Sequence, residues 1–314
     1  MFSAKSTQVL VVGAGSAGIS AAISAARNGA RTMLVERAGF LGGISATLPW
    51  LGFHDREYRQ VVKGFAHEVV SELQRRGAAS SYTFDPKCSS LVSLDGHEWK
   101  CLAMELAEDA GVRVLLHTMV VDTIVGSSPD GNRSLQGVVV ENKNGRELIL
   151  ADVVIDCSGD GDVAARAGAE WQKGRTEDGL VQAPTLVFRL GGLDRAKFVA
   201  ACKNPELNYR EWIHGRPELW EKMMKRLDTL ETFVLGGFAP VMTRARDAGD
   251  LDVPQTRVVG VKTHRPDELT VVSTRVLGLD AIGEAMSTGQ IGQILSIDFW
   301  KALRFTLMFT LVTL

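Results

Sequence analysis

Three glycines near the start of the chain, Gly13, Gly15 and Gly18, have G-x-G-x-x-G spacing and directly follow an apolar run. This spacing is typical of a strand-to-helix turn that binds the pyrophosphate of a dinucleotide. Gly13 permits the tight bend, Gly15 lets the phosphates approach the backbone, and Gly18 lets helix and strand pack closely. The first N–H groups of the helix, around Ser16 and Ala17, have no partner within the helix, so we expect them to bind phosphate oxygens.

A second apolar run, residues 31–35, ends in Glu36, at the distance from the turn that the dinucleotide-binding pattern requires. An acidic side chain there is placed to accept hydrogen bonds from both hydroxyls of an adenosine ribose. The carboxylate would repel a 2′-phosphate, which disfavours NADP. Arg37 beside it either weakens that preference or lies across the adenine. The sequence therefore predicts a dinucleotide that carries adenosine.

Residues 37–47 follow as a loop with a second glycine pair, Gly42 and Gly43, and small hydroxyl residues. Backbone without side chains can lie against another section of a long cofactor, and Ser45 or Thr47 offers a hydroxyl to bond it. A plain turn is the alternative. In a simple nicotinamide dehydrogenase we would expect a helix here instead.

A second strand-turn-helix unit is predicted further along the chain. An apolar strand at residues 151–156, which suits a buried parallel position, runs into a glycine-rich turn and then a short helix at 163–167. The turn places free N–H groups at the carboxyl edge of a sheet, where open α/β folds bind their ligands.

Hydrophobic periodicity and turn residues predict the other elements. We expect helices at 56–76, 96–110 and 206–230, and strands at 112–116, 118–124, 137–141, 147–149, 186–190, 257–263 and 269–277. The fold class is therefore α/β: a Rossmann-like domain at residues 1–170, with a central parallel sheet and a β-hairpin, carries an inserted α+β lobe at 171–285. Residues 286–314 form an atypical tail.

Composition restricts the partners. Lys and Arg number 35 against 37 Asp and Glu, a formal charge of −2, so there is no electrostatic case for nucleic acid.

Four scattered cysteines without a C-x-x-C pair predict no metal site and reduced thiols, and hence a cytoplasmic protein. No apolar run precedes the first strand, so we expect no signal peptide. The apolar stretch at 299–314 is too short to span a bilayer and carries Lys301 and Arg304.

Several motifs in this order resemble the FAD-dependent oxidoreductases of the glutathione-reductase-like superfamily. They are the first glycine turn, Glu36-Arg37, the Gly39–Gly43 loop, residues 154–162 and residues 183–188. The resemblance implies a Rossmann-like FAD-binding domain with noncovalently bound FAD.

The resemblance also implies which residues hold that cofactor. Gly13, Gly15 and Gly18 would hold the pyrophosphate and Glu36 the AMP ribose. Gly42 and Gly43 would lie along the pyrophosphate and ribityl chain. The backbone near Val121 would hold the adenine, and Ser158, Gly159 and Asp160 would close over the cofactor.

The implied activity is hydride transfer from a small organic substrate to the flavin, with electrons passed to an unidentified acceptor. Candidates for orienting the substrate and moving its proton are His54 and Arg275, with Arg189, Arg244 and Arg257 as further clamps for a carboxylate. An NAD-dependent dehydrogenase, on the first motif alone, is one alternative. The other is a truncated, non-catalytic remnant, because the superfamily usually continues through a last FAD-binding unit and nothing after Gly292 resembles it.

Overall fold

The computed structural model describes residues 4–48, 50–55, 57–85, 89–127, 131–183, 185–208, 217–251 and 254–273. The chain divides into two compact units. The first unit comprises Met1–Pro49, Gly64–Ala78 and Asp95–Trp171, and the second comprises Trp50–Lys63, Ala79–Leu94 and Gln172–Leu314. The sequence-based boundaries at 170 and 285 stay predictions, but the contacts assign residues 50–63 and 79–94 to the second unit.

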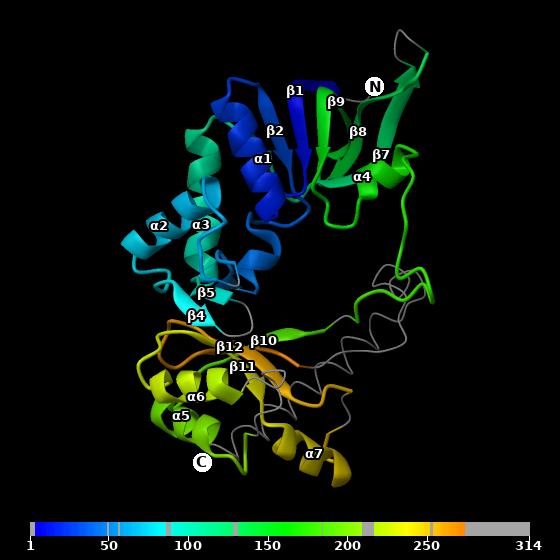
Figure 1. Cartoon of the computed structure of the whole chain (residues 1–314). Helices are drawn as coiled ribbons and strands as arrows, with labels where there is room; N and C mark the ends of the chain where they lie inside the picture. The colour runs from blue at the N-terminus through cyan, green and yellow to red at the C-terminus, as the bar shows by residue number, and fades with distance from the viewer. Residues whose placement is uncertain are drawn as a thin grey trace. The chain divides into compact units, whose positions relative to one another are not determined.

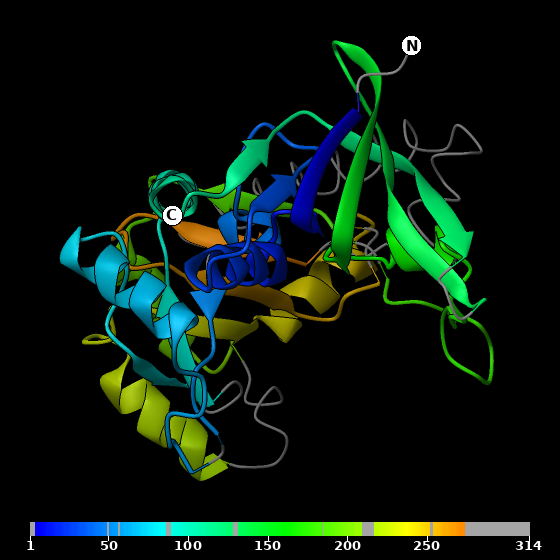
Figure 2. The same ribbon diagram turned by 90° about the horizontal axis from the view of Figure 1, so that it is seen from above.

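The first unit contains a six-stranded sheet of order β6-β2-β1-β9-β8-β7 (Figure 1). The strands are β1 Ala4–Val12, β2 Thr32–Val35, β6 Arg113–Leu115, β7 Met119–Ser127, β8 Arg133–Asn142 and β9 Gly145–Asp156. The β6, β2, β1 and β9 strands are parallel, whereas β8 pairs antiparallel with both of its neighbours. Figure 2 shows β7 and β8 continuing the sheet beyond β9. The predicted parallel sheet with a hairpin is confirmed.

Two helices of this unit start where the sequence signals indicate. Helix α1 (Ser16–Arg27) follows the first glycine turn and packs on β1 and β2. Helix α3 (Gly96–Asp109) begins at Asp95, whose carboxylate accepts from the amides of His97 and Glu98 as an N-cap. The remaining helices are α2 (Phe65–Arg75), α4 (Asp162–Arg166) and the 3-10 turn η1 (Gly43–Ala46).

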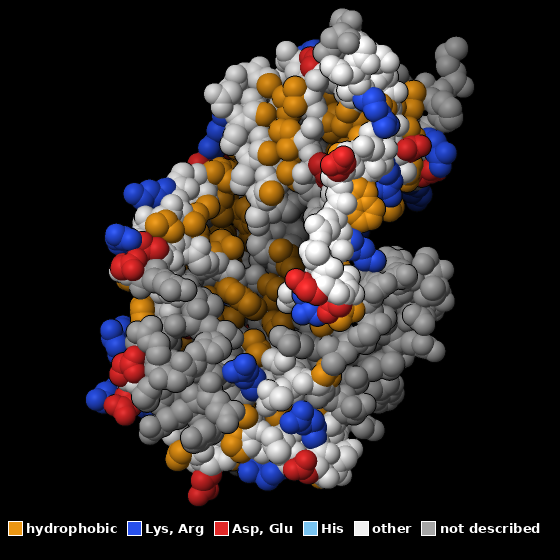
Figure 3. Space-filling model, turned by 45° about the vertical axis from the view of Figure 1, so that its right-hand side comes forward, with side chains coloured by type: hydrophobic (Ala, Val, Ile, Leu, Met, Phe, Trp, Pro, Cys, Tyr) orange, Lys and Arg blue, Asp and Glu red, His pale blue; other side chains and the backbone are white. Residues whose placement is uncertain are grey.

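Strand β9 corrects two expectations. Residues 147–149 and 151–156 form one continuous strand, in which residues 145–150 pair with β8 and residues 148–156 pair with β1. The run 151–156 is not fully buried, since Val153 is 52% exposed, and Leu150 just before it is 40% exposed. Hydrophobic side chains accordingly reach the surface over this unit, at the top of Figure 3. An apolar strand sequence alone did not reveal which side is covered.

The second unit contains two antiparallel sheets. One has the order β3-β5-β4 (Trp50–Leu51, Ser89–Ser93, Thr83–Asp85) and the other the order β10-β13-β12-β11 (Val187–Leu190, Leu269–Val272, Val258–Lys262, Phe233–Gly237). The predicted antiparallel pairing of 257–263 with 269–277 is confirmed within the described residues, with Lys262 opposite Leu269. Helices α5 (Arg195–Lys203), α6 (Pro217–Arg226) and α7 (Ala239–Asp247) complete the unit.

Two helix predictions were wrong in part. The helix expected at 56–76 begins only at Phe65, because Asp55 accepts backbone hydrogen bonds from Glu57 and Arg59 and so stabilises a turn before it. Of the helix expected at 206–230, the described residues contain α6 (Pro217–Arg226), and residues 209–216 lie outside the described part of the chain. Residues 204–208 form a turn instead, in which the Asn208 side chain donates to the Cys202 carbonyl.

The chain passes from one unit to the other at 49/50, 63/64, 78/79, 94/95 and 171/172. Two of these passages run next to each other, since Ala79 and Leu94 form an antiparallel bridge. The Asp95 amide donates to the Ala78 carbonyl at 2.7 Å, and the Ser80 amide donates to the Ser93 carbonyl at 2.9 Å. Within the described ranges, no helix is long and apolar enough to cross a membrane.

Candidate cofactor site

The first glycine turn is built by close backbone packing. Gly13 has φ +94°, and a Cβ placed on it would lie 2.2 Å from the carbonyl oxygen of Cys157, the residue after β9. A Cβ on Gly18 would lie 1.8 Å from the Gly13 carbonyl oxygen. These two glycines are therefore needed for the turn to form, whatever the turn binds.

Gly15 differs from both. Its backbone is extended, with φ −73° and ψ −173°, and a Cβ there would meet no heavy atom within 4 Å. Gly15 is the N-cap residue of α1 and makes no side-chain cap bond, and the first turn of α1 contains no acidic residue. The first amides of α1 therefore have no cap from a side chain and lie at the positive end of the helix dipole, which favours binding of an anion.

Glu36 directly follows β2, beside this turn. Its Oε2 accepts from the Ala14 amide at 2.6 Å, and its Oε1 accepts from the Ala38 amide at 2.7 Å. Two backbone donors therefore hold the carboxylate in place, while each oxygen retains a further lone pair for a ligand hydroxyl. Glu36 has a structural role as well as the predicted role in binding the ribose, because its hydrogen bond from the Ala14 amide connects the end of β2 to the glycine turn.

The second glycine pair packs directly on the first turn. The Gly42 amide donates to the Ala14 carbonyl at 2.9 Å, and a Cβ on Gly43 would lie 2.7 Å from Gly15 Cα. The Ser45 hydroxyl, which was predicted to bond to a cofactor, is already hydrogen-bonded within the protein. Ser45 is buried, and its Oγ donates to the Gly42 carbonyl and accepts from Trp99 Nε1 at 2.9 Å.

The turn after β9 is organised by Asp156. Its Oδ1 accepts from the amide and hydroxyl of Ser158 at 3.0 and 2.6 Å, and its Oδ2 accepts from the amides of Val163 and Ala164 at 2.9 Å each. Burial raises the pKa of Asp156, but the hydrogen bonds from Ser158, Ala164 and Val163 outweigh it, so the pKa lies below its ordinary value. A single carboxylate thus fixes both the turn and the start of α4.

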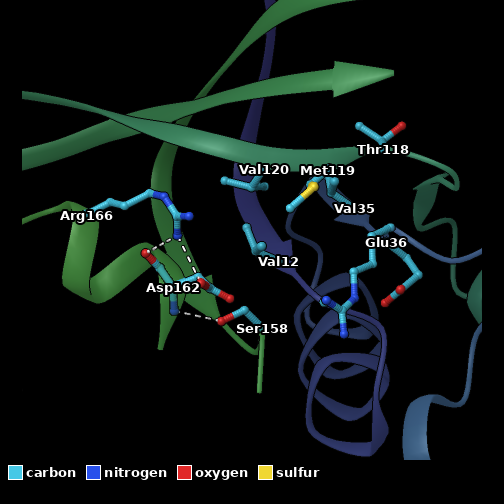
Figure 4. A pocket seen from close by; sticks show the side chains of 11 residues that line it. Val12, Val35, Glu36, Thr118, Met119, Val120, Ser158, Asp162 and Arg166 are labelled. Carbon is cyan, nitrogen blue, oxygen red and sulfur yellow. Dashed lines mark hydrogen bonds and ion pairs between the residues drawn. The ribbon is translucent and has the colours of Figure 1, made fainter. Parts of the chain in front are cut away.

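A pocket open to solvent lies between these two turns. The carboxyl ends of β1 and β2, the start of β7 and the start of α4 form its walls. Its lining residues are Val12, Gly13, Val35, Glu36, Arg37, Thr118, Met119, Val120, Ser158, Asp162 and Arg166. Figure 4 shows Arg166 reaching across to Asp162, with which it pairs at 3.0 Å, while Glu36 lies apart from them near the end of β2. The pocket combines apolar side chains with carboxylates and guanidinium groups, as a nucleoside requires.

The sequence pattern of the FAD dependent oxidoreductases matches residues 8–281. The chain belongs to this family. No curated protein is similar enough in sequence to match the chain.

The comparison with solved structures finds an FAD-dependent halogenase of similar fold. The myxobacterial chondrochloren halogenase CndH is 16% identical with a TM-score of 0.51, over 94% of this chain and 58% of its own. A geranylgeranyl bacteriochlorophyll reductase-like protein from Thermoplasma acidophilum is 15% identical with a TM-score of 0.49, over 86% of this chain and 57% of its own. The chain therefore spans under two thirds of the length of these proteins.

FAD is the cofactor of the family, and the residues present fit it. The uncapped N-terminus of α1 with open space at Gly15 suits a diphosphate, and the carboxylate of Glu36 suits a ribose. Four of the predicted residues, Gly13, Glu36, Arg37 and Ser158, come together in the pocket lining.

The other predicted cofactor residues lie around that pocket without lining it. Gly15, Ser16, Ala17 and Gly18 form the start of α1. Gly42 and Gly43 pack against it, and the Ser16 hydroxyl donates to Ser45 at 3.0 Å. Val121 lies in β7 at a shift of register between Val120 and Asp122, next to the lining residue Val120. Gly159 and Asp160 are exposed in the turn before α4.

Sequence reasoning missed Asp156, Asp162, Arg166 and Met119. A signal existed for the first two, because each flanks the glycine-rich turn where an acidic residue can cap a helix. The i, i+4 spacing of Asp162 and Arg166 also indicates their pairing. No pattern in the sequence marks Met119, whose place depends on how β7 crosses the end of β2.

The catalytic candidates belong to the second unit. Arg275 lies outside the described residues. His54 is half-buried and stacks on Tyr58. Of the further arginines, Arg189 is paired with Glu268 at 4.0 Å.

Proposed function

We propose that the chain is an FAD-dependent oxidoreductase that takes a hydride from a small organic substrate onto noncovalently bound FAD. The observation that carries the proposal is the open, uncapped N-terminus of α1 at Gly15 with a fixed carboxylate, Glu36, beside it. The family match over residues 8–281 supports the same reading.

Each part of the site has a task in holding the cofactor. The amides of Gly15, Ser16, Ala17 and Gly18 would bind the pyrophosphate, and Glu36 the AMP ribose. The apolar wall of Val120 and Met119, with the backbone at Val121, would face the adenine. Bound FAD supplies a two-electron acceptor that can take up a hydride.

The turn from Ser158 to Asp160 would close over the cofactor, and Asp156 fixes the start of that turn through the amide and hydroxyl of Ser158. A preformed turn loses little conformational entropy on binding. Gly42 and Gly43 would support the pyrophosphate from the other side through their contact with Gly15.

We further propose that the chain is of the glutathione-reductase-like type, with a cofactor domain at 1–170 and a substrate lobe at 171–285. The parallel strands followed by the antiparallel β7–β8 pair support this. His54 and Arg275 stay the predicted substrate-facing groups. The electron acceptor and the cytoplasmic location are predictions too.

The test is the cofactor content of the purified protein. We expect flavin absorbance, and a cofactor that heat releases and mass spectrometry identifies as FAD. Colourless protein should take up added FAD but not NAD. Tight NAD binding without flavin uptake would instead establish a nicotinamide dehydrogenase, and uptake of neither would indicate a non-catalytic remnant.

A further inference from the structure

Four rings gather around His54 in the second unit, and we name them the His54 cluster: His54, Tyr58, Tyr82 and Phe84. The His54 ring stacks on Tyr58 with centroids 4.3 Å apart and planes 11° apart. Tyr82 meets His54 edge-on at 5.5 Å, and Phe84 meets Tyr58 edge-on at 5.5 Å. All four residues are half-buried, so each is partly exposed to solvent.

The backbone is strained to make this stack. Tyr58 has φ +60°, a conformation that is rare for a bulky side chain and costs of the order of 1–3 kcal/mol. Asp55 holds the turn through hydrogen bonds from the amides of Glu57 and Arg59. The Ser90 hydroxyl oxygen accepts from the amides of Phe53 and His54 at 2.8 and 3.2 Å. Such strain is characteristic of functional sites.

The cluster contains a polar atom that the fold leaves unsatisfied. His54 Nδ1 is buried, and no donor or acceptor among the described residues reaches it. A buried polar atom without a partner is costly, so a bound molecule that hydrogen-bonds to His54 Nδ1 would remove that cost.

Positive charge borders the rings. Lys222 Nζ lies 5.1 Å from the Phe84 ring centroid, and Arg226, one helical turn further along α6, acts electrostatically on Tyr58. Both cations are exposed. Burial raises the pKa of the Tyr58 hydroxyl despite Arg226, and burial raises that of Tyr82, so both phenols stay protonated at neutral pH and add no negative charge.

We propose that the His54 cluster binds the substrate and that the substrate is a planar organic anion, an aromatic or conjugated carboxylate. The flat rings select a planar molecule by stacking. Lys222 and Arg226 select its charge. As a substrate assignment this rests on the proposed function, but the binding itself requires no flavin.

The experiment uses benzoate as the probe and isothermal titration calorimetry of the full chain, with and without added FAD. Cyclohexanecarboxylate, which has the same charge but is not planar, and benzyl alcohol, which is aromatic but neutral, are the matched ligands. We expect benzoate to bind on the order of tenfold more tightly than either, because each control ligand lacks one of the two selected features.

Variants separate the contributions. Lys222→Gln combined with Arg226→Gln, and His54→Leu alone, should each weaken benzoate binding by on the order of tenfold. Lys225→Gln is the control, since it removes an exposed cation from the same helix without touching the rings. Circular dichroism and thermal melts must show that all variants are folded, and a second histidine variant, His54→Gln, replaces His54→Leu if that one unfolds.

Absence of benzoate binding to the folded wild type, or equal weakening by Lys225→Gln, would overturn the inference. FAD uptake without benzoate binding would refute this inference and leave the proposed function unaffected. Benzoate binding at the His54 cluster without FAD uptake would refute the proposed function but support the proposed binding site.

Discussion

Replacing Gly15 with valine separates cofactor binding from folding. The Gly15 backbone is extended and suits any residue, and a Cβ there meets no heavy atom within 4 Å. The added side chain therefore causes no clash at its Cβ and projects from the N-cap position of α1, next in the chain to the amides proposed to bind phosphate. Loss of the glycine N-cap should destabilise the fold by about 1 kcal/mol or less.

The effect on FAD should be much larger. A hydrogen bond from an amide to a charged phosphate contributes about 1.5–3 kcal/mol. If the valine side chain prevents two of them, the loss is about 3–6 kcal/mol, or roughly 10² to 10⁴ in Kd. Fluorescence titration with FAD measures this loss, and urea unfolding without FAD measures stability.

Gly18→Ala is the matched control. Its Cβ would lie 1.8 Å from the Gly13 carbonyl oxygen, so we expect a loss of stability of about 1–3 kcal/mol or more even without cofactor. The reasoning is refuted if Gly15→Val binds FAD like the wild type, or if it unfolds as readily as Gly18→Ala.

Three other changes have defined outcomes. Glu36→Ala should weaken FAD binding by about 1.5–3 kcal/mol, measured by the same titration, because it removes a charged acceptor. Asp156→Asn should lower the free energy of unfolding by about 2–3 kcal/mol in urea, because an amide cannot accept from four donors. Since the pKa of Asp156 lies below its ordinary value of 3.8, its contribution is present above that value and is lost as the pH falls through the lower folded pKa. Lys262 is fully buried, and burial lowers its pKa to about 8. The wild type should therefore gain stability relative to Lys262→Met as the pH rises from about 8 to 10.5, in thermal melts across that range.

The first unit was largely predictable because its signals are local. A strand, a glycine turn and a helix follow one another at the first turn and again after β9, and Asp95 marks the start of α3. Glu36 could be placed from its spacing alone. The internal use of Ser45 could not, because the Trp99 indole that bonds it comes from a distant helix.

The second unit was predicted less well because fewer of its elements are marked by local signals in the sequence. The turn at 54–60 depends on the Asp55 side chain bonding its own backbone, which competes with a helix pattern that would otherwise continue. Helix α5 was missed although Asp194 caps it by accepting from the Lys197 amide. The short strands β3 and β4 form only because β5 lies between them.

The repeated passage of the chain between the two units has a practical consequence. No single cut in the sequence releases either unit intact, because residues 50–63 and 79–94 would be left in the wrong fragment. A fragment ending near residue 171 would keep β3, β4 and β5 without the four-stranded sheet of the unit to which they belong. Mapping activity by serial truncation would thus damage both halves at once, and point substitutions are the appropriate means of dissecting this molecule.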